Sequence, residues 1–242
     1  MSSGPRIYTP QPLTPGSRLE LDSQAATHLV RVLRLTDGDA LRLFNGDGCE
    51  YAATLSDSGK KSASADITGV VREDAPLPLQ LHLGQVVSKG DRMDFTIQKA
   101  TELGISDITP LWSERCEVRL KGERLDKKIE HWQKVAVSAC EQSGRNVIPR
   151  IHPPLSFNDW CAQTEADLKF ILHPHDQKPL RDYTQPQTLA LLVGPEGGFS
   201  ETEVQQVLAA GFHGLTLGPR ILRTETAALT ALSVFQYQWG DF

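Results

Sequence analysis

Hydrophobic positions in the first third of the chain alternate with polar positions, which is the pattern of half-buried strands. The segment 40–44 runs into Asn45-Gly46 and Asp47-Gly48, two dipeptides that favour tight turns between strands. The alternation returns over 50–55 and again over 65–71. These segments predict a series of short strands that are joined by turns.

One helix precedes this series. Residues 23–35 carry Leu29, Val30 and Leu33 on one side, which predicts a helix with a single apolar face. We therefore expect a small β-barrel with one helix over residues 1–74, and the Pro-rich segment 75–78 has the composition of a linker.

From residue 79 onward the hydrophobic pattern changes. Apolar runs without alternation are typical of strands that are buried on both faces of a parallel sheet; they occupy 168–172, 188–193 and 214–217. Two further strands are predicted over 79–87 and 108–112, and stretches with helical periodicity cover 91–103 and 126–143, each followed by a glycine. Strands that alternate with helices predict an α/β domain over residues 79–242.

The composition is that of a globular protein. Of the 242 residues, 39% are hydrophobic and 23% are charged, which excludes global disorder. No apolar run approaches the ~20 residues that span a bilayer, and the N-terminus lacks a charged-then-apolar signal pattern. We therefore expect a cytoplasmic protein that has no membrane partner.

The net charge of -5 and the isoelectric point near 5.8 argue, at first sight, against a nucleic-acid partner. The charge is unevenly spread, however: residues 81–150 hold 12 basic and 10 acidic side chains, whereas residues 151–242 hold 5 and 10. Because net charge governs solubility and long-range steering, it does not exclude a local basic surface that binds RNA.

Neither the cysteines nor the histidines predict a reactive or metal-binding centre. Cys49, Cys116, Cys140 and Cys161 are far apart in the sequence and predict buried free thiols, with Cys140 packed on a helix face rather than acting as a nucleophile. The histidines lack convincing metal-ligand spacing, and the G-x-S-x-G motif of serine hydrolases is absent. No metal site is expected.

Two glycine-containing segments that follow predicted strands carry the most chemical information. In the first, Gly194-Pro-Glu-Gly-Gly198 precedes Ser200 and Glu203, which match a capping box that opens a helix. Such a loop lies where ligands bind, beyond the carboxyl ends of the strands. The spacing matches neither G-x-G-x-x-G nor a P-loop, and Glu196 is acidic, so a phosphate cradle is disfavoured. The loop is either a ligand contact or a tight turn that needs glycine.

The second segment is Gly218-Pro-Arg-Ile-Leu-Arg-Thr-Glu-Thr226. A solvated helix start explains Thr224 and Glu225, but it explains less well the two arginines that bracket an apolar pair. A carboxylate in the first Gly-Pro turn and arginines in the second predict a pocket between them. At the end of the long helix, Glu141-Gln-Ser-Gly-Arg-Asn146 is either an ordinary C-cap or a polar cluster that faces this pocket.

Several stretches together resemble the RsmE-type 16S ribosomal RNA (uracil-N3)-methyltransferases of the SPOUT superfamily. They are Arg6-Ile-Tyr8, His28-Leu-Val-Arg-Val-Leu-Arg34, Phe95-Thr-Ile-Gln-Lys-Ala-Thr-Glu-Leu-Gly104, Ser113-Glu-Arg115, Ala139-Cys-Glu-Gln-Ser-Gly-Arg145, Gly194-Pro-Glu-Gly-Gly198 and Leu217-Gly-Pro-Arg-Ile-Leu-Arg-Thr-Glu-Thr-Ala227. The resemblance covers nearly the whole chain, is weakest over 146–166, and is most specific in its last two motifs.

This resemblance implies an N-terminal PUA-like β-barrel for RNA and a C-terminal SPOUT α/β domain with a deep trefoil knot. It also implies a homodimer, the cofactor S-adenosyl-L-methionine bound in the knot, and methylation of N3 of a specific uridine in 16S ribosomal RNA within the small subunit. The cofactor-binding residues that it implies are Leu172, Gly194, Glu196, Gly197, Leu217, Gly218, Ile221, Leu222 and Thr224.

Methylation at this atom needs a base, because N3 of uridine carries a proton at neutral pH. We hypothesise that Arg223 stabilises negative charge on the uracil carbonyls and that Glu225 or Glu196 takes the proton. For RNA contacts we expect the basic residues Arg6, Arg31, Arg34, Lys60, Lys61 and Arg145, with Lys89 and Arg92 as an extension.

Two other classes of function compete with this interpretation. A non-catalytic RNA-binding ribosome assembly factor would keep the loops without using a methyl donor, so cofactor binding separates the two. A nicotinamide-dependent dehydrogenase would need a glycine fingerprint that the sequence lacks.

Overall fold

The computed structural model describes residues 4–59, 62–118, 120–173 and 178–242. The chain divides into two compact units, of which the first holds the residues up to Pro76 together with Cys140–Ile148. The second holds Leu77–Ala139 and Pro149–Phe242. The position of the linker at 75–78 stays a prediction, but the structure assigns residues 140–148 to the first unit although the sequence pattern placed them in the α/β domain.

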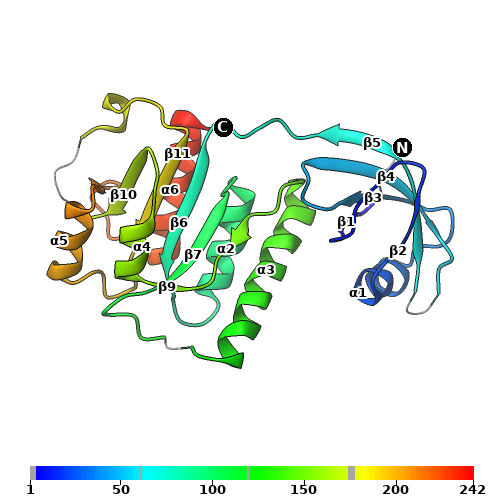
Figure 1. Ribbon diagram of the computed structural model, residues 1–242, viewed down its shortest axis with the longest axis horizontal. Coiled ribbons are helices and arrows are strands. Elements are labelled where there is room, and N and C mark those ends of the chain that lie inside the picture. The colour runs from blue at the N-terminus through cyan, green and yellow to red at the C-terminus, as the bar shows by residue number, and fades with distance from the viewer. Residues whose placement is uncertain (1–3, 60–61, 119, 174–177) are drawn as a thin grey trace. The chain divides into compact units, whose positions relative to one another are not determined.

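The first unit contains a curled five-stranded sheet with the order β1-β3-β4-β5-β2 (Figure 1). Its strands are β1 (Arg6–Tyr8), β2 (Arg18–Glu20), β3 (Ala40–Phe44), β4 (Cys49–Ser56) and β5 (Ser64–Glu73). Strand β1 pairs with β3 in parallel, and the other neighbours pair in antiparallel fashion. The strands predicted from alternation are confirmed as β3, β4 and β5. Strands β1 and β2 were not predicted, because three residues are too few for alternation to be visible.

The core of this sheet follows from the period of two residues in a strand. Along β4, the buried side chains of Tyr51, Ala53 and Leu55 face the same side and join one apolar cluster with Leu29. The predicted helix over 23–35 is shorter in the structure. It consists of α1 (Ser23–Thr27), whose N-terminus is capped by the Asp22 side chain, and a one-turn π-helix, η1 (His28–Val32).

The second unit is built on a sheet in which every pair of neighbouring strands is parallel, with the order β12-β10-β11-β6-β7-β8. The strands are β6 (Gln80–Val86), β7 (Asp107–Trp112), β8 (Arg150–Ile151), β9 (Leu155–Ser156, paired with β7), β10 (Leu168–Leu172), β11 (Thr188–Val193) and β12 (His213–Leu215). The predicted strands are confirmed, and in β10 and β11 both ends agree with the prediction.

Helices cover both faces of this sheet. They are α2 (Arg92–Glu102), α3 (Glu123–Ser143), α4 (Phe157–Gln163), α5 (Glu201–Ala209) and α6 (Thr224–Trp239), with a 3₁₀ turn at Leu180–Asp182. Helices α2 and α6 lie behind the sheet in the view of Figure 1, and α4 lies in front of it. Within the described ranges, no helix has the length and apolar character of a membrane span.

The sheet core contains almost only apolar side chains. Leu83, Leu191 and Phe170 on the central strands and Trp132 of α3 are fully buried. Because the parallel strands all point the same way, the loops that follow them meet at one edge of the sheet, and the candidate site lies there.

Candidate active site at the carboxyl ends of the strands

A cavity of about 920 Å³ lies where β6, β7 and β11 end and α6 begins. Its lining is mostly charged and comes from loops that are far apart in the sequence: Lys89, Gly90, Asp91, Arg92, Phe95, Glu117, Glu196, Glu225 and Thr226. The cavity therefore contains residues of both chemically informative segments, together with a basic pair from the start of α2.

The first Gly-Pro turn contacts the start of α6, although the arginines of the second segment do not line the cavity. The hydroxyl of Thr224 donates a hydrogen bond of 2.7 Å to the carbonyl oxygen of Gly194. The same hydroxyl accepts a hydrogen bond of 3.0 Å from Nε2 of Gln85, whose side chain is only 1% exposed on β6. Gln85 was not among the site residues predicted from the sequence. An amide side chain within an otherwise apolar strand was the signal that could have found it, because a buried polar group needs a partner.

The glycine loop after β11 is stabilised by a residue from another part of the chain. Arg115 donates a hydrogen bond of 2.9 Å through Nη1 to the carbonyl oxygen of Gly197, and Gly198 has a φ of +67°, which favours glycine. The capping box predicted for Ser200 and Glu203 is confirmed, with both reciprocal hydrogen bonds present. The loop is thus fixed at both ends rather than being a free turn.

The residues expected at the cofactor follow three adjacent strands. Leu172 ends β10, the glycine loop follows β11, and the segment from Leu217 to Leu222 follows β12, just before Thr224 opens α6. The register of the parallel strands brings these segments to the same edge. Within them Gly218 has a φ of +80°, and the Ile221 side chain is fully exposed, an unusual position for an apolar group.

The structure brings two of the three candidate catalytic side chains into one cavity. Glu196 and Glu225 both line it, but they differ in their partners. Oε1 of Glu196 accepts a hydrogen bond of 2.5 Å from Arg92, whereas Oε2 of Glu225 is buried and has no hydrogen-bond partner among the described residues. Arg223 precedes α6 as an exposed residue and does not line this cavity.

The structure corrects the expectation that Arg6 contacts RNA. Its side chain is only 15% exposed, and Nε forms an ion pair of 2.6 Å with Glu50. The four remaining N–H groups point to the carbonyl oxygens of Cys140, Glu141 and Arg145 and to Oδ1 of Asn146, at 2.6–3.1 Å. All five donors of a guanidinium are therefore used inside the first unit, and none is left for a phosphate.

The polar segment Glu141–Asn146 at the end of α3, for which the sequence left open a C-cap or a pocket wall, is a structural element of the first unit. Oε1 of Glu141 accepts a hydrogen bond of 3.0 Å from the backbone N–H of Tyr8. Asn146 is fully buried and donates to both carboxylate oxygens of Asp74. These contacts fix the end of the helix to the first unit, with Oε1 of Glu141 bound by β1.

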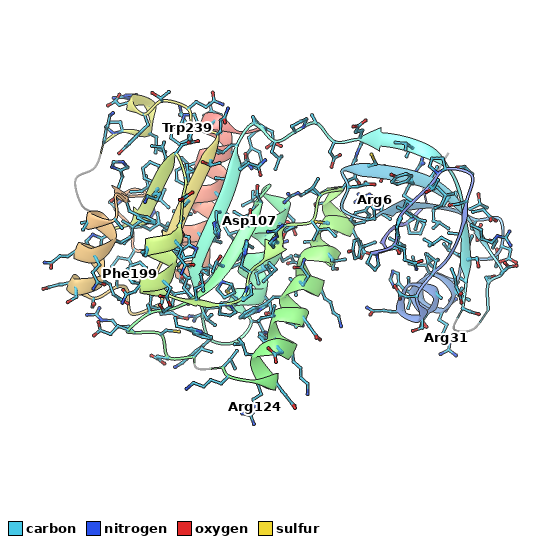
Figure 2. The ribbon with its side chains drawn as sticks, in the orientation of Figure 1. Arg6, Arg31, Asp107, Arg124, Phe199 and Trp239 are labelled. Atoms are coloured by element: carbon cyan, nitrogen blue, oxygen red, sulfur yellow. The ribbon has the colours of Figure 1, made fainter. Side chains whose placement is uncertain are left out.

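The other basic residues expected at RNA have different surroundings. Arg31 on η1 is exposed and points away from the rest of its unit (Figure 2), and Arg34 is exposed with a φ of +58°. Arg145 is half-buried and its carbonyl oxygen is bound by Arg6. Lys60 and Lys61 lie outside the described residues.

The thiols are unsuited to nucleophilic chemistry. Burial raises the pKa of Cys140 to about 11 and the pKa of Cys161 to about 12, so both stay protonated at neutral pH. All four cysteines are free thiols. In the part of the chain that the structure describes, no three or more His, Cys, Asp or Glu side chains group so as to hold a metal ion.

One carboxylate fixes the first turn of α2, which lines the cavity, to α3. Asp94 accepts hydrogen bonds from Nζ of Lys128 at 2.9 Å, from the ring of His131 at 2.6 Å and from Nε1 of Trp132 at 3.0 Å. Partial burial alone would raise the pKa of Asp94, but the hydrogen bonds from Lys128 and His131 outweigh it and hold the pKa below its ordinary value.

Replacing Asp94 with Asn should therefore lower the free energy of unfolding at pH 7 by about 1–2 kcal/mol. A carboxyl whose pKa is lowered by folding contributes stability above its unfolded pKa, near 3.9, and loses it as the pH falls through the folded pKa. Urea unfolding at pH 7 and at pH 3 should show the difference between wild type and variant shrinking in acid. The exposed Asp241→Asn variant is the control, and an equal loss at both pH values would contradict this role.

Comparison with known protein families identifies the class to which this chain belongs. Residues 75–236 match the RNA methyltransferase domain, and residues 21–68 match the RNA methyltransferase PUA domain. The ribosomal RNA small subunit methyltransferase E of Buchnera aphidicola is 37% identical, over 98% of this chain and 95% of the relative. The enzyme of the same name from Bacillus subtilis is 31% identical, over 95% and 94%.

The solved structures agree with the sequence relatives. The ribosomal RNA small subunit methyltransferase E from Neisseria gonorrhoeae, solved with bound S-adenosyl methionine, superposes with a TM-score of 0.93 at 42% identity, over 99% of both chains. The fold is therefore a mixed α/β fold with an N-terminal PUA sheet and the C-terminal parallel sheet of SPOUT methyltransferases. The chain belongs to the ribosomal RNA small subunit methyltransferase E family.

Proposed function

We propose that this chain transfers a methyl group from S-adenosyl-L-methionine to N3 of a specific uridine in 16S ribosomal RNA. The observation that carries the proposal is Glu225, a residue of the cavity lining whose Oε2 is buried and has no hydrogen-bond partner among the described residues. A methyl acceptor that must first lose a proton needs such a group. A non-catalytic assembly factor does not, so the catalytic interpretation is favoured.

The loops after β10, β11 and β12 fit the cofactor. They offer backbone groups, glycines with positive φ and the exposed apolar Ile221, but no phosphate-binding motif, which suits a nucleoside that carries an amino acid and no phosphate. When bound there, the sulfonium group supplies an activated methyl group. The residues that we propose to hold it are those of the matched motifs, namely Leu172, Gly194, Glu196, Gly197, Leu217, Gly218, Ile221, Leu222 and Thr224.

Glu225 is our candidate for the general base. The ion pair with Arg92 occupies Oε1 of Glu196, whereas Oε2 of Glu225 has no hydrogen-bond partner among the described residues. Removal of the N3 proton places negative charge on the uracil carbonyls, and an arginine near them would stabilise that charge. Arg223 is our candidate for this role: it lies outside the cavity lining, but it is exposed, precedes Glu225 by two residues and makes no ion pair with the described side chains.

We also propose the division of labour between the domains. The barrel of residues 1–74 contacts RNA through Arg31 and Arg34, and the domain of residues 79–242 carries the chemistry and the trefoil knot of the superfamily. The left-handed φ of Arg34 supports this, because strained backbone at a non-glycine residue concentrates at functional sites. We propose further that the chain acts as a homodimer and that its substrate is the small ribosomal subunit.

A methyl-transfer assay tests the function. Purified protein and labelled S-adenosylmethionine are incubated with small ribosomal subunits from cells that lack the gene, or with their naked RNA. The expected result is transfer of about one methyl group per subunit, recovered as 3-methyluridine after digestion. Label in another nucleoside, or no label in either substrate, would contradict the proposal.

A further inference from the structure

Phe95 stands out among the residues of the cavity. It lies in the first turns of α2, and its side chain is 47% exposed, whereas its neighbours Met93 and Ile97 are fully buried in the core. The ring lines the same cavity as Glu225. The buried face of α2 supplies the contacts between this helix and the core, and Phe95 is not part of that face. Packing within this chain therefore does not explain an exposed aromatic ring at this position.

The proposed substrate needs an exposed aromatic side chain of this kind. N3 lies on the Watson–Crick edge of uracil, and enzymes that modify a base take it out of its stack to reach such an atom. A base that has left its stack loses the contact with its neighbours. Proteins that bind unstacked RNA bases replace that contact with an aromatic side chain, which offers its flat face to the ring.

The remaining residues of the cavity match the other parts of a nucleotide. Lys89, which lines the cavity, carries the positive charge that a flanking phosphate needs and is paired with Glu117 in the RNA-free protein, whereas Arg92 is paired with Glu196. The cavity of about 920 Å³ has room for a nucleotide and its neighbours.

We infer that this cavity receives the target uridine in a flipped-out conformation, and that Phe95 stacks on the face of its ring. Glu225 then faces the edge of the base, Lys89 exchanges Glu117 for an RNA phosphate, and Arg92 keeps its ion pair with Glu196. The inference rests on the proposed function and adds to it a residue that selects an unstacked pyrimidine and holds it for reaction.

The kinetics of Phe95 variants on small ribosomal subunits from cells that lack the gene test this inference. Phe95→Ala should lower kcat/KM about 5- to 150-fold, which corresponds to a stacking free energy of about 1–3 kcal/mol. Phe95→Tyr should keep most of the activity because it keeps an aromatic face. Phe95→Leu should lose nearly as much as the Ala variant, since it is apolar but offers no flat ring.

Two controls separate stacking from other roles. Phe242→Ala removes an exposed ring at the C-terminus, 62% exposed, and should leave kcat/KM unchanged. Calorimetric affinity for S-adenosylmethionine and the sedimentation mass of each Phe95 variant should equal those of wild type. Full activity in Phe95→Leu, or a lower mass in Phe95→Ala, would show that the ring packs against another protein surface and would overturn the inference.

The same measurements distinguish failure of the proposed function from failure of the stacking role. If wild type forms no 3-methyluridine, the proposed function itself is wrong. If wild type and Phe95→Ala form it with the same kcat/KM, only the stacking role is wrong.

Discussion

Glu225→Gln should lower the rate of methyl transfer by a factor of about 10²–10⁴, which is the usual contribution of a positioned general base. The amide keeps the shape of the side chain but cannot accept the N3 proton of the target base. The buried oxygen has no partner among the described residues, so the substitution breaks no hydrogen bond there. Single-turnover measurement on small ribosomal subunits reports the chemical step, and calorimetry should show unchanged affinity for S-adenosylmethionine.

Glu196→Gln is the matched control, because it changes the other carboxylate of the same cavity. This variant removes the charge that pairs with Arg92, a pair in which both side chains are more than one-third exposed. Its effect on the single-turnover rate should be smaller than that of Glu225→Gln. A Glu196→Gln variant that is inactive, beside a Glu225→Gln variant that keeps its rate, would reverse our assignment of the base.

Arg6→Ala should lower the free energy of unfolding by about 3–5 kcal/mol. The substitution leaves the Glu50 carboxylate, whose side chain is only 12% exposed, without its ion-pair partner. It also removes the donor that binds the last carbonyl groups of α3 and the segment after it. Removing one partner of a buried pair costs more than the pair contributes, because the other charge stays buried and uncompensated. Chemical denaturation measures the loss.

Arg18→Ala is the control within the same unit. Arg18 forms ion pairs with Asp57 and Asp66, but its side chain is 56% exposed and solvent screens these pairs, so the loss should be far smaller than that of Arg6→Ala. If Arg6→Ala were as stable as Arg18→Ala and instead weakened RNA binding, the internal role of Arg6 would be wrong. The original expectation of an RNA contact would then return.

The fold was predictable where the hydrophobic pattern is regular. The apolar runs of 168–172 and 188–193 became β10 and β11 with the same ends, since strands buried on both faces leave no polar position to obscure them. The pattern failed where an element is short or depends on distant contacts. Strand β1 has three residues, and residues 140–148 belong to the first unit, where Arg6, Tyr8 and Asp74 bind them.

The site was predictable in its loops and not in its detailed contacts. Glycine turns after buried strands indicated the edge of the sheet, and Glu196 and Glu225 do share a cavity. The sequence could not show that Arg92 engages one of these carboxylates, because the two residues are 104 positions apart. Arg6 is the clearest error, since the same guanidinium that suits a phosphate also suits the carbonyl groups of a helix end.

The most direct test of the central claim is nucleoside mass spectrometry of 16S ribosomal RNA from cells with and without this gene. We predict a 3-methyluridine that disappears when the gene is deleted, returns with wild type and does not return with the Glu225→Gln variant. An unchanged 3-methyluridine signal in the deletion strain would contradict it.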